Sequence, residues 1–152
     1  MSVLERLSEL GLTLPKVAAP VAAYIPAVST GKLVFTSGQL PFVDGELPVT
    51  GLVGAEVSAE EAAALARICA LNALAAIDAE IGSLDRVTRI VKVTGFVASA
   101  DGFTGQPVVV NGASELFGEV FGDVGVHARS AVGVAQLPLA SPVEVEVIAE
   151  FA

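Results

Sequence analysis

The chain has 152 residues, a formal net charge of −9 and a pI of about 4.4. It has 17 acidic residues against eight basic ones and no basic cluster, so it repels polyanions, which argues against nucleic-acid binding. The mean hydropathy is +0.72, yet no run of about 18 uninterrupted apolar residues occurs, so we expect no membrane span.

The length predicts a single domain over residues 1–152 with a substantial buried core. With 53% hydrophobic and only 16% charged residues, the chain is more apolar than a small monomer needs, which predicts a homo-oligomer. Its start lacks the basic region and long apolar run of a signal peptide. Cys69 is the only cysteine, so an internal disulfide is excluded, and we expect a core thiol in a cytoplasmic protein.

The first predicted helix begins at Ser2, whose side chain can form a capping box with Glu5. It runs to about Leu10 and stops at Gly11, which gives a helical extension over residues 1–16. An extended segment from Val17 to Ile25 follows.

A turn at Thr30-Gly31 leads into a predicted strand over residues 32–37. The strand runs directly into the sequence Ser37-Gly38-Gln39. Residues 43–46, Val-Asp-Gly-Glu, are typical of a tight turn.

The longest predicted element is a helix of about 23 residues between the capping pair Ser58 and Glu61 and the stop at Gly82. Its many alanines allow close approach to a sheet. Asn72 is polar within this apolar stretch, and we assign it a structural hydrogen bond. Residues 86–97 form the next predicted strand.

A second helix is predicted from Val108 to Phe121, followed by a strand that begins near Ala128. The last strand, Val143 to Phe151, alternates apolar and polar residues with the period of a half-buried strand. Prolines at 138 and 142 end one strand and start the next, which predicts a hairpin. The element order indicates an α+β fold with two helices on one face of a mixed sheet.

Arg129 and Glu144 are the leading candidates for chemistry, because the hairpin would place them on neighbouring strands. Arginine binds carboxylates through its planar fork, and a glutamate can position a water molecule. From the spacing alone, a surface arginine and a solvated glutamate are the commoner situation, and a functional pair is the less frequent one.

Other motifs are weaker or missing from the sequence. His127, the only histidine, has no second ligand at metal-binding spacing, and a structural role is favoured. Asn111 could present its amide to a pocket or could be an ordinary residue at the start of a helix. The sequence has no phosphate loop, dinucleotide fingerprint or nucleophile elbow.

Several short motifs occur together over residues 20–151. The C-terminal motif is an arginine, a short apolar strand that ends in Leu-Pro, and a glutamate six residues beyond the proline. The other motifs are a Ser-Gly-Gln sequence, a tyrosine 13 residues before its serine, and an asparagine. The positions are Tyr24, Ser37-Gly38-Gln39, Asn111, Arg129, Leu137-Pro138 and Glu144. In this combination the chain resembles the Rid family of reactive intermediate deaminases, also called the YjgF family.

The resemblance implies a chorismate-mutase-like fold that assembles as a homotrimer with pockets between subunits. It implies hydrolysis of 2-imino acids to 2-keto acids and ammonia without a cofactor or a metal. Arg129 would hold the substrate carboxylate with help from the Gly38 N–H, and Glu144 would activate water. The pocket would be lined by Tyr24, Ser37, Asn111 and Ala131.

Two departures from the family pattern indicate a divergent subgroup. Archetypal members have a cysteine two residues after the arginine, whereas this chain has Ala131. The extension over residues 1–16 is longer than in compact members.

Four functions therefore stay open: a 2-imino acid hydrolase, a non-catalytic module that binds small carboxylates, a ribonuclease and, on fold analogy alone, a chorismate-rearranging enzyme. The net charge of −9 disfavours the ribonuclease.

Overall fold

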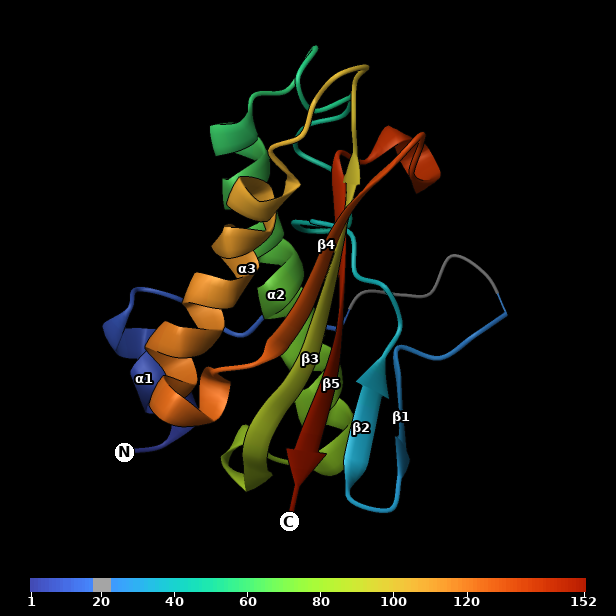
Figure 1. Ribbon diagram of the computed structural model, residues 1–152. Helices are drawn as coiled ribbons and strands as arrows, with labels where there is room; N and C mark the ends of the chain where they lie inside the picture. Colours follow the sequence, from blue (N-terminus) through green and yellow to red (C-terminus); the bar gives the residue numbers. More distant parts are fainter. Residues whose placement is uncertain (18–22) are drawn as a thin grey trace.

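A five-stranded mixed sheet forms one layer of the computed structural model, which describes residues 1–17 and 23–152, and the helices lie on one of its faces (Figure 1). The helices are α1 (Val3–Glu9), α2 (Ala59–Ile81) and α3 (Gln106–Phe121), with short 3₁₀ turns at Leu84–Arg86, Gly122–Gly125 and Pro138–Ala140. The strands are β1 (Ala27–Thr30), β2 (Leu33–Thr36), β3 (Val87–Ala98), β4 (Ala128–Val134) and β5 (Val143–Phe151). The α+β architecture with a one-sided helical layer is as predicted, with α1 as a third, short helix.

The strand order is β1-β2-β5-β3-β4, and only the β3–β4 pair is parallel. The predicted hairpin of the last two strands is therefore wrong, because β3 lies between them. The physical reason is the helix between β3 and β4, whose crossover makes these two strands parallel neighbours and places β4 at the edge. The long β5 then pairs along the other side of β3.

The alternation of β5 is confirmed. Its four apolar positions from Val143 to Ala149 are buried, whereas Glu144 and Glu146 are only half-buried on the opposite face. The same alternation sets the register against β3, where Phe96 lies opposite Glu144. The helix-facing side of the sheet is thus the core, and the other side carries the carboxylates.

Helix α2 has the predicted bounds. The Ser58 side chain accepts a hydrogen bond from the Glu61 N–H, and Gly82 ends the helix with a φ of 90°. By length and composition alone α2 could cross a membrane, but most of it is buried in the core of the domain. Asn72 has the structural role expected of it, since its Nδ2 donates to the carbonyls of Leu40 and Phe42 at 3.0 and 3.1 Å.

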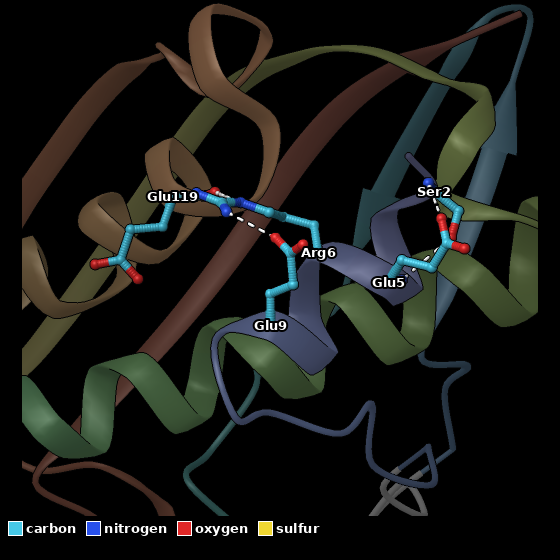
Figure 2. A network of polar contacts seen from close by, with 5 residues as sticks. All are labelled: Ser2, Glu5, Arg6, Glu9 and Glu119. Carbon is cyan, nitrogen blue, oxygen red and sulfur yellow. Dashed lines mark hydrogen bonds and ion pairs between the residues drawn. The ribbon is translucent and has the colours of Figure 1, made fainter.

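The N-terminal extension is a docked helix (Figure 2). Ser2 and Glu5 form the predicted capping box, and Leu7 is 1% exposed. Arg6 donates from Nε to the carbonyl of Glu119 near the end of α3 at 2.9 Å. The extension therefore holds the C-terminal end of the helix that also carries Asn111.

Two boundaries differ from the sequence-based expectation. Helix α3 begins at Gln106 and not at Val108. Pro107 is accommodated in the first turn, because a backbone N–H at that position would form no hydrogen bond within the helix. Asn111 consequently lies in the second turn of α3 and not at its entrance. Of the extended segment predicted from Val17 to Ile25, residues 18–22 lie outside the described residues, and the first strand begins only at Ala27.

Gly112 is expected to be essential for the packing of α3 on α2. A Cβ at this position would lie 2.7 Å from the carbonyl carbon of Ala63, so Gly112→Ala must push the two helices apart. We expect a loss of about 1–3 kcal/mol in the free energy of unfolding, measured by denaturant titration. Gly118→Ala is the matched control, because nothing lies within 4 Å of its Cβ, and it should gain about 0.5–1 kcal/mol.

Candidate active site

The guanidinium of Arg129 is held at the edge of the sheet by neutral oxygen atoms of α3. Its Nη1 donates to Asn111 Oδ1 at 2.7 Å and to Ser114 Oγ at 3.3 Å, and its Nη2 donates to the Pro107 carbonyl at 3.4 Å. These acceptors lie on one face of the helix, at spacings of four and three residues. Among the residues that the structure describes, no carboxylate forms an ion pair with Arg129. Its positive charge is therefore anchored without being neutralised.

The register of β4 shows which way Arg129 and Ala131 face. Arg129 lies opposite the fully buried Val93 of β3, and Ala131 lies opposite Gly95. A Cβ on Gly95 would come within 2.8 Å of Val110 Cγ1 of α3, so this side of the sheet faces the helices. Since register partners share a face, Arg129 and Ala131 are on the helical side.

Glu144 lies on the opposite side of the sheet, against the loop that follows β2. Its carboxyl carbon would be 2.7 Å from a Cβ on Gly38, so a larger residue at position 38 would displace the Glu144 side chain. The next residues of the two segments fix this contact, because Gln39 and Val145 exchange backbone hydrogen bonds of 2.8 and 3.0 Å. The predicted Ser-Gly-Gln motif and Glu144 thus form one local unit.

The environment of Glu144 favours its protonated form. Burial raises the pKa of the Glu144 carboxyl above the usual value of 4.5, and the negative charge of Glu146 on the same face raises it further. A carboxyl with a raised pKa is a stronger base than a solvated one, which suits the transfer of a proton from water.

Ser37 lies directly before Gly38, which contacts Glu144, and it binds the segment that carries Tyr24. The Ser37 hydroxyl donates to the Ile25 carbonyl at 2.6 Å, and the Ser37 N–H donates to the Pro26 carbonyl at 2.8 Å. These bonds tie the loop after β2 to the segment that carries Tyr24, whose side chain is 45% exposed.

The predicted site is therefore divided into two halves within one chain. The guanidinium half contains Arg129, Asn111 and Ala131, whereas the carboxylate half contains Glu144 and the motif at residues 37–39. Strand β3 separates the halves, which places them roughly 10 Å apart across the sheet and on opposite faces. The expectation that Arg129 and Glu144 sit on neighbouring strands is wrong, and the two groups do not converge within a single chain.

A cavity of about 640 Å³ lies elsewhere, between the segment after α1, the turn at residues 42–45 and α2. It is lined by Thr13, Pro15, Lys16, Val17, Phe42, Val43, Asp44, Gly45, Ile68, Leu71 and Asn72. None of the predicted site residues belongs to this cavity. Within residues 1–17 and 23–152, no group of three or more His, Cys, Asp or Glu side chains is arranged to hold a metal ion.

The sequence reasoning missed Ser114, which contacts both Arg129 and His127. A usable signal was present, since Pro107, Asn111 and Ser114 follow the spacing of one helix face. Without knowing that this face meets β4, the spacing could not be connected to Arg129.

The comparisons with known proteins agree with this fold and these motifs. Residues 4–151 match the family described as "YjgF/chorismate mutase-like, putative endoribonuclease". The chain belongs to the YjgF family, which confirms the resemblance drawn from the sequence.

Three similar proteins illustrate the range of the family. Protein TCP17 of Trypanosoma cruzi is 47% identical over 150 residues, which cover 98% of this chain and 94% of that protein. A crystal structure of a protein of unknown function from Agrobacterium tumefaciens has a TM-score of 0.92 and 46% identity, and covers 99% of this chain and 92% of that one. The 2-iminobutanoate/2-iminopropanoate deaminase of Salmonella typhimurium is 35% identical over 131 residues, which cover 86% of this chain and 89% of the deaminase.

Proposed function

We propose that this protein hydrolyses 2-imino acids to 2-keto acids and ammonia at sites formed between the subunits of a homotrimer. Membership of the YjgF family and similarity to a protein named 2-iminobutanoate/2-iminopropanoate deaminase support this choice of chemistry. The reaction balances with water alone: water adds to the imine carbon, and the resulting carbinolamine expels ammonia and leaves the keto group.

The state of Arg129 is the observation that carries the proposal. Both hydrogens of Nη1 are used by Asn111 and Ser114, and one hydrogen of Nη2 points to Pro107. The Nε–H and one Nη2–H have no acceptor among the described residues. An arginine can bind a carboxylate in bidentate fashion, and no described carboxylate forms an ion pair with Arg129.

Glu144 supplies the other part of the chemistry. As a carboxylate beside Gly38, it would take a proton from the attacking water and return it to the departing nitrogen. The Gly38 N–H would assist Arg129 in holding the substrate carboxylate, and Tyr24, Ser37, Asn111 and Ala131 would line the pocket.

The separation of the two halves supports a shared site. Because Arg129 and Glu144 face opposite sides of one sheet, a single chain cannot present both to one small substrate. A ring of identical subunits in which the β4 edge of one chain meets the uncovered sheet face of the next would bring them together.

The test is the loss of a 2-imino acid generated in situ by an amino-acid oxidase. The wild type should accelerate formation of the keto acid, and Arg129→Ala should lower kcat/KM by about 10²-fold or more, because the substrate carboxylate loses its fork. Arg129→Lys is the matched control, since it keeps the charge but cannot bind in bidentate fashion, and it should retain an intermediate activity. Wild-type rates equal to buffer with several amino acids would contradict the proposal.

A second candidate function is the binding of a small carboxylate without turnover, which the loss of the family cysteine at Ala131 favours. In that case 2-keto acids would raise the melting temperature of the protein, because a ligand of the folded state stabilises it, while imine hydrolysis would stay at the buffer rate.

A further inference from the structure

A chain of hydrogen bonds continues from Arg129 into the protein. The Ser114 hydroxyl oxygen lies 3.3 Å from Arg129 Nη1 and 2.9 Å from His127 Nε2. His127 Nδ1 in turn lies 2.7 Å from the carbonyl oxygen of Gly125, near the end of the 3₁₀ turn that precedes β4. The motif pattern of the family assigns no role to Ser114 or His127.

The direction of each hydrogen bond follows from the chemistry of the partners. A carbonyl oxygen only accepts, so the Nδ1 of His127 must carry the proton that points at Gly125. In the neutral ring Nε2 is then a bare acceptor, and the Ser114 hydroxyl must donate to it. The lone pairs of Ser114 are left to accept from Arg129, so every donor in the chain has one acceptor.

Packing fixes the ring in this orientation. The rings of Phe117 and His127 meet edge to face, with centroids 5.9 Å apart and planes at 88°. Ser114 and Phe117 are three residues apart on α3, so the same helix face holds the ring and receives its Nε2. His127 and Arg129 are two residues apart along an extended segment and therefore project to the same side.

We propose that Ser114 and His127 are positioning residues that aim the guanidinium of Arg129 at a substrate carboxylate. His127 acts through Ser114: it directs the hydroxyl hydrogen away from Arg129, so that the oxygen can accept from Nη1. With Asn111 on the other hydrogen of Nη1, rotation of the guanidinium is blocked and the fork made by Nε and Nη2 stays turned outward. This inference rests on the proposed function, because it assigns a purpose to the orientation of Arg129.

The first test does not depend on activity. His127 is the only histidine, so ¹⁵N-histidine labelling gives the spectrum of this ring alone. We expect the tautomer protonated at Nδ1 in the wild type, and in Ser114→Ala a change in the Nε2 chemical shift. A ring protonated at Nε2 in the neutral wild type would overturn the inference, because Ser114 could not then donate to it.

The second test measures the dissociation constant of 2-oxobutanoate by calorimetry and the kinetics of imine hydrolysis. Ser114→Ala should weaken binding and raise KM about 5- to 10-fold with kcat nearly unchanged, since one hydrogen bond to a charged group is lost. Ser114→Thr keeps the hydroxyl and should restore binding to within about twofold. Glu115→Ala, next to Ser114 on an exposed face of α3, is the control and should bind like the wild type.

The third test asks whether His127 acts through Ser114. His127→Phe keeps a ring against Phe117 but loses both nitrogens, and it should weaken binding as Ser114→Ala does. The double variant should bind 2-oxobutanoate about as tightly as the single variants do, because both changes break the same series of hydrogen bonds. Additive losses, or normal binding by Ser114→Ala, would contradict the inference. A wild type that binds no 2-oxobutanoate would instead contradict the proposed function. The His127 tautomer would still show whether Ser114 donates a hydrogen bond to His127.

Discussion

Glu144→Gln is expected to lower kcat for imine hydrolysis by about 10²- to 10⁴-fold, the usual contribution of a positioned general base. The amide has nearly the same shape as the carboxyl group, so it should fit above Gly38 as Glu144 does. It cannot accept a proton from water, and therefore only the chemical step should suffer. The measurement is single-turnover hydrolysis of an imine generated in situ, together with the dissociation constant of 2-oxobutanoate, which should stay within about threefold of the wild type.

Glu146→Gln is the matched control, because Glu146 lies two residues away on the same face of β5. It should keep most of the activity. A Glu144→Gln protein with wild-type kcat would rule out Glu144 as the base, whatever the fate of Arg129.

The pH dependence of the rate gives the same assignment by another route. The base must be ionised, so the rate should fall as the pH drops through the pKa of Glu144, which burial and then Glu146 raise above 4.5. The acid limb of the profile should therefore lie at a higher pH than that of a solvated glutamate. Glu146→Gln removes the repelling charge, lowers the pKa of Glu144 and should move this limb to lower pH.

Mixing two inactive variants should restore activity if the site is shared between chains. In Arg129→Ala the carboxylate half is intact, and in Glu144→Gln the guanidinium half is intact. A ring with head-to-tail contacts, assembled at random from equal amounts of both, would contain about a quarter of its sites with both halves intact. Tandem purification of co-expressed variants with different affinity tags keeps only mixed trimers, in which one of the three sites has both halves intact, so we expect about a third of the wild-type activity.

Two controls make this experiment decisive. Each variant purified alone should stay inactive. Chains carrying both substitutions should restore no activity to either single variant, because one of the two groups is then missing from every site. Mixed assemblies without any recovered activity would show that one chain supplies both groups, which the opposite faces of Arg129 and Glu144 argue against.

Local sequence signals were sufficient for much of the fold. The capping residues Ser2 and Ser58 and the stop at Gly82 set the bounds of α1 and α2 because capping acts within one turn of a helix. The alternation in residues 143–151 set the buried face of β5 because a strand has a period of two. The order of α and β elements likewise indicated a one-sided layer of helices.

Strand order could not be obtained from such signals. Proline and polar residues between β4 and β5 indicate only that the chain turns, and they do not tell which strand β4 will pair with. The crossover through α3 decided that pairing by placing β4 beside β3. As a consequence Arg129 and Glu144, predicted as neighbours, lie on opposite faces.

The sequence by itself selected the residues that we propose for the chemistry, because Arg129, Glu144 and the motif at residues 37–39 match the pattern of the family. Only the tertiary structure decided how these residues are grouped: Glu144 with Gly38, and Arg129 with Asn111, Ser114 and, through Ser114, His127. The reason is that contacts between residues far apart in the chain depend on the packing of α3 against the edge of the sheet, which is set by the whole core and not by any local pattern.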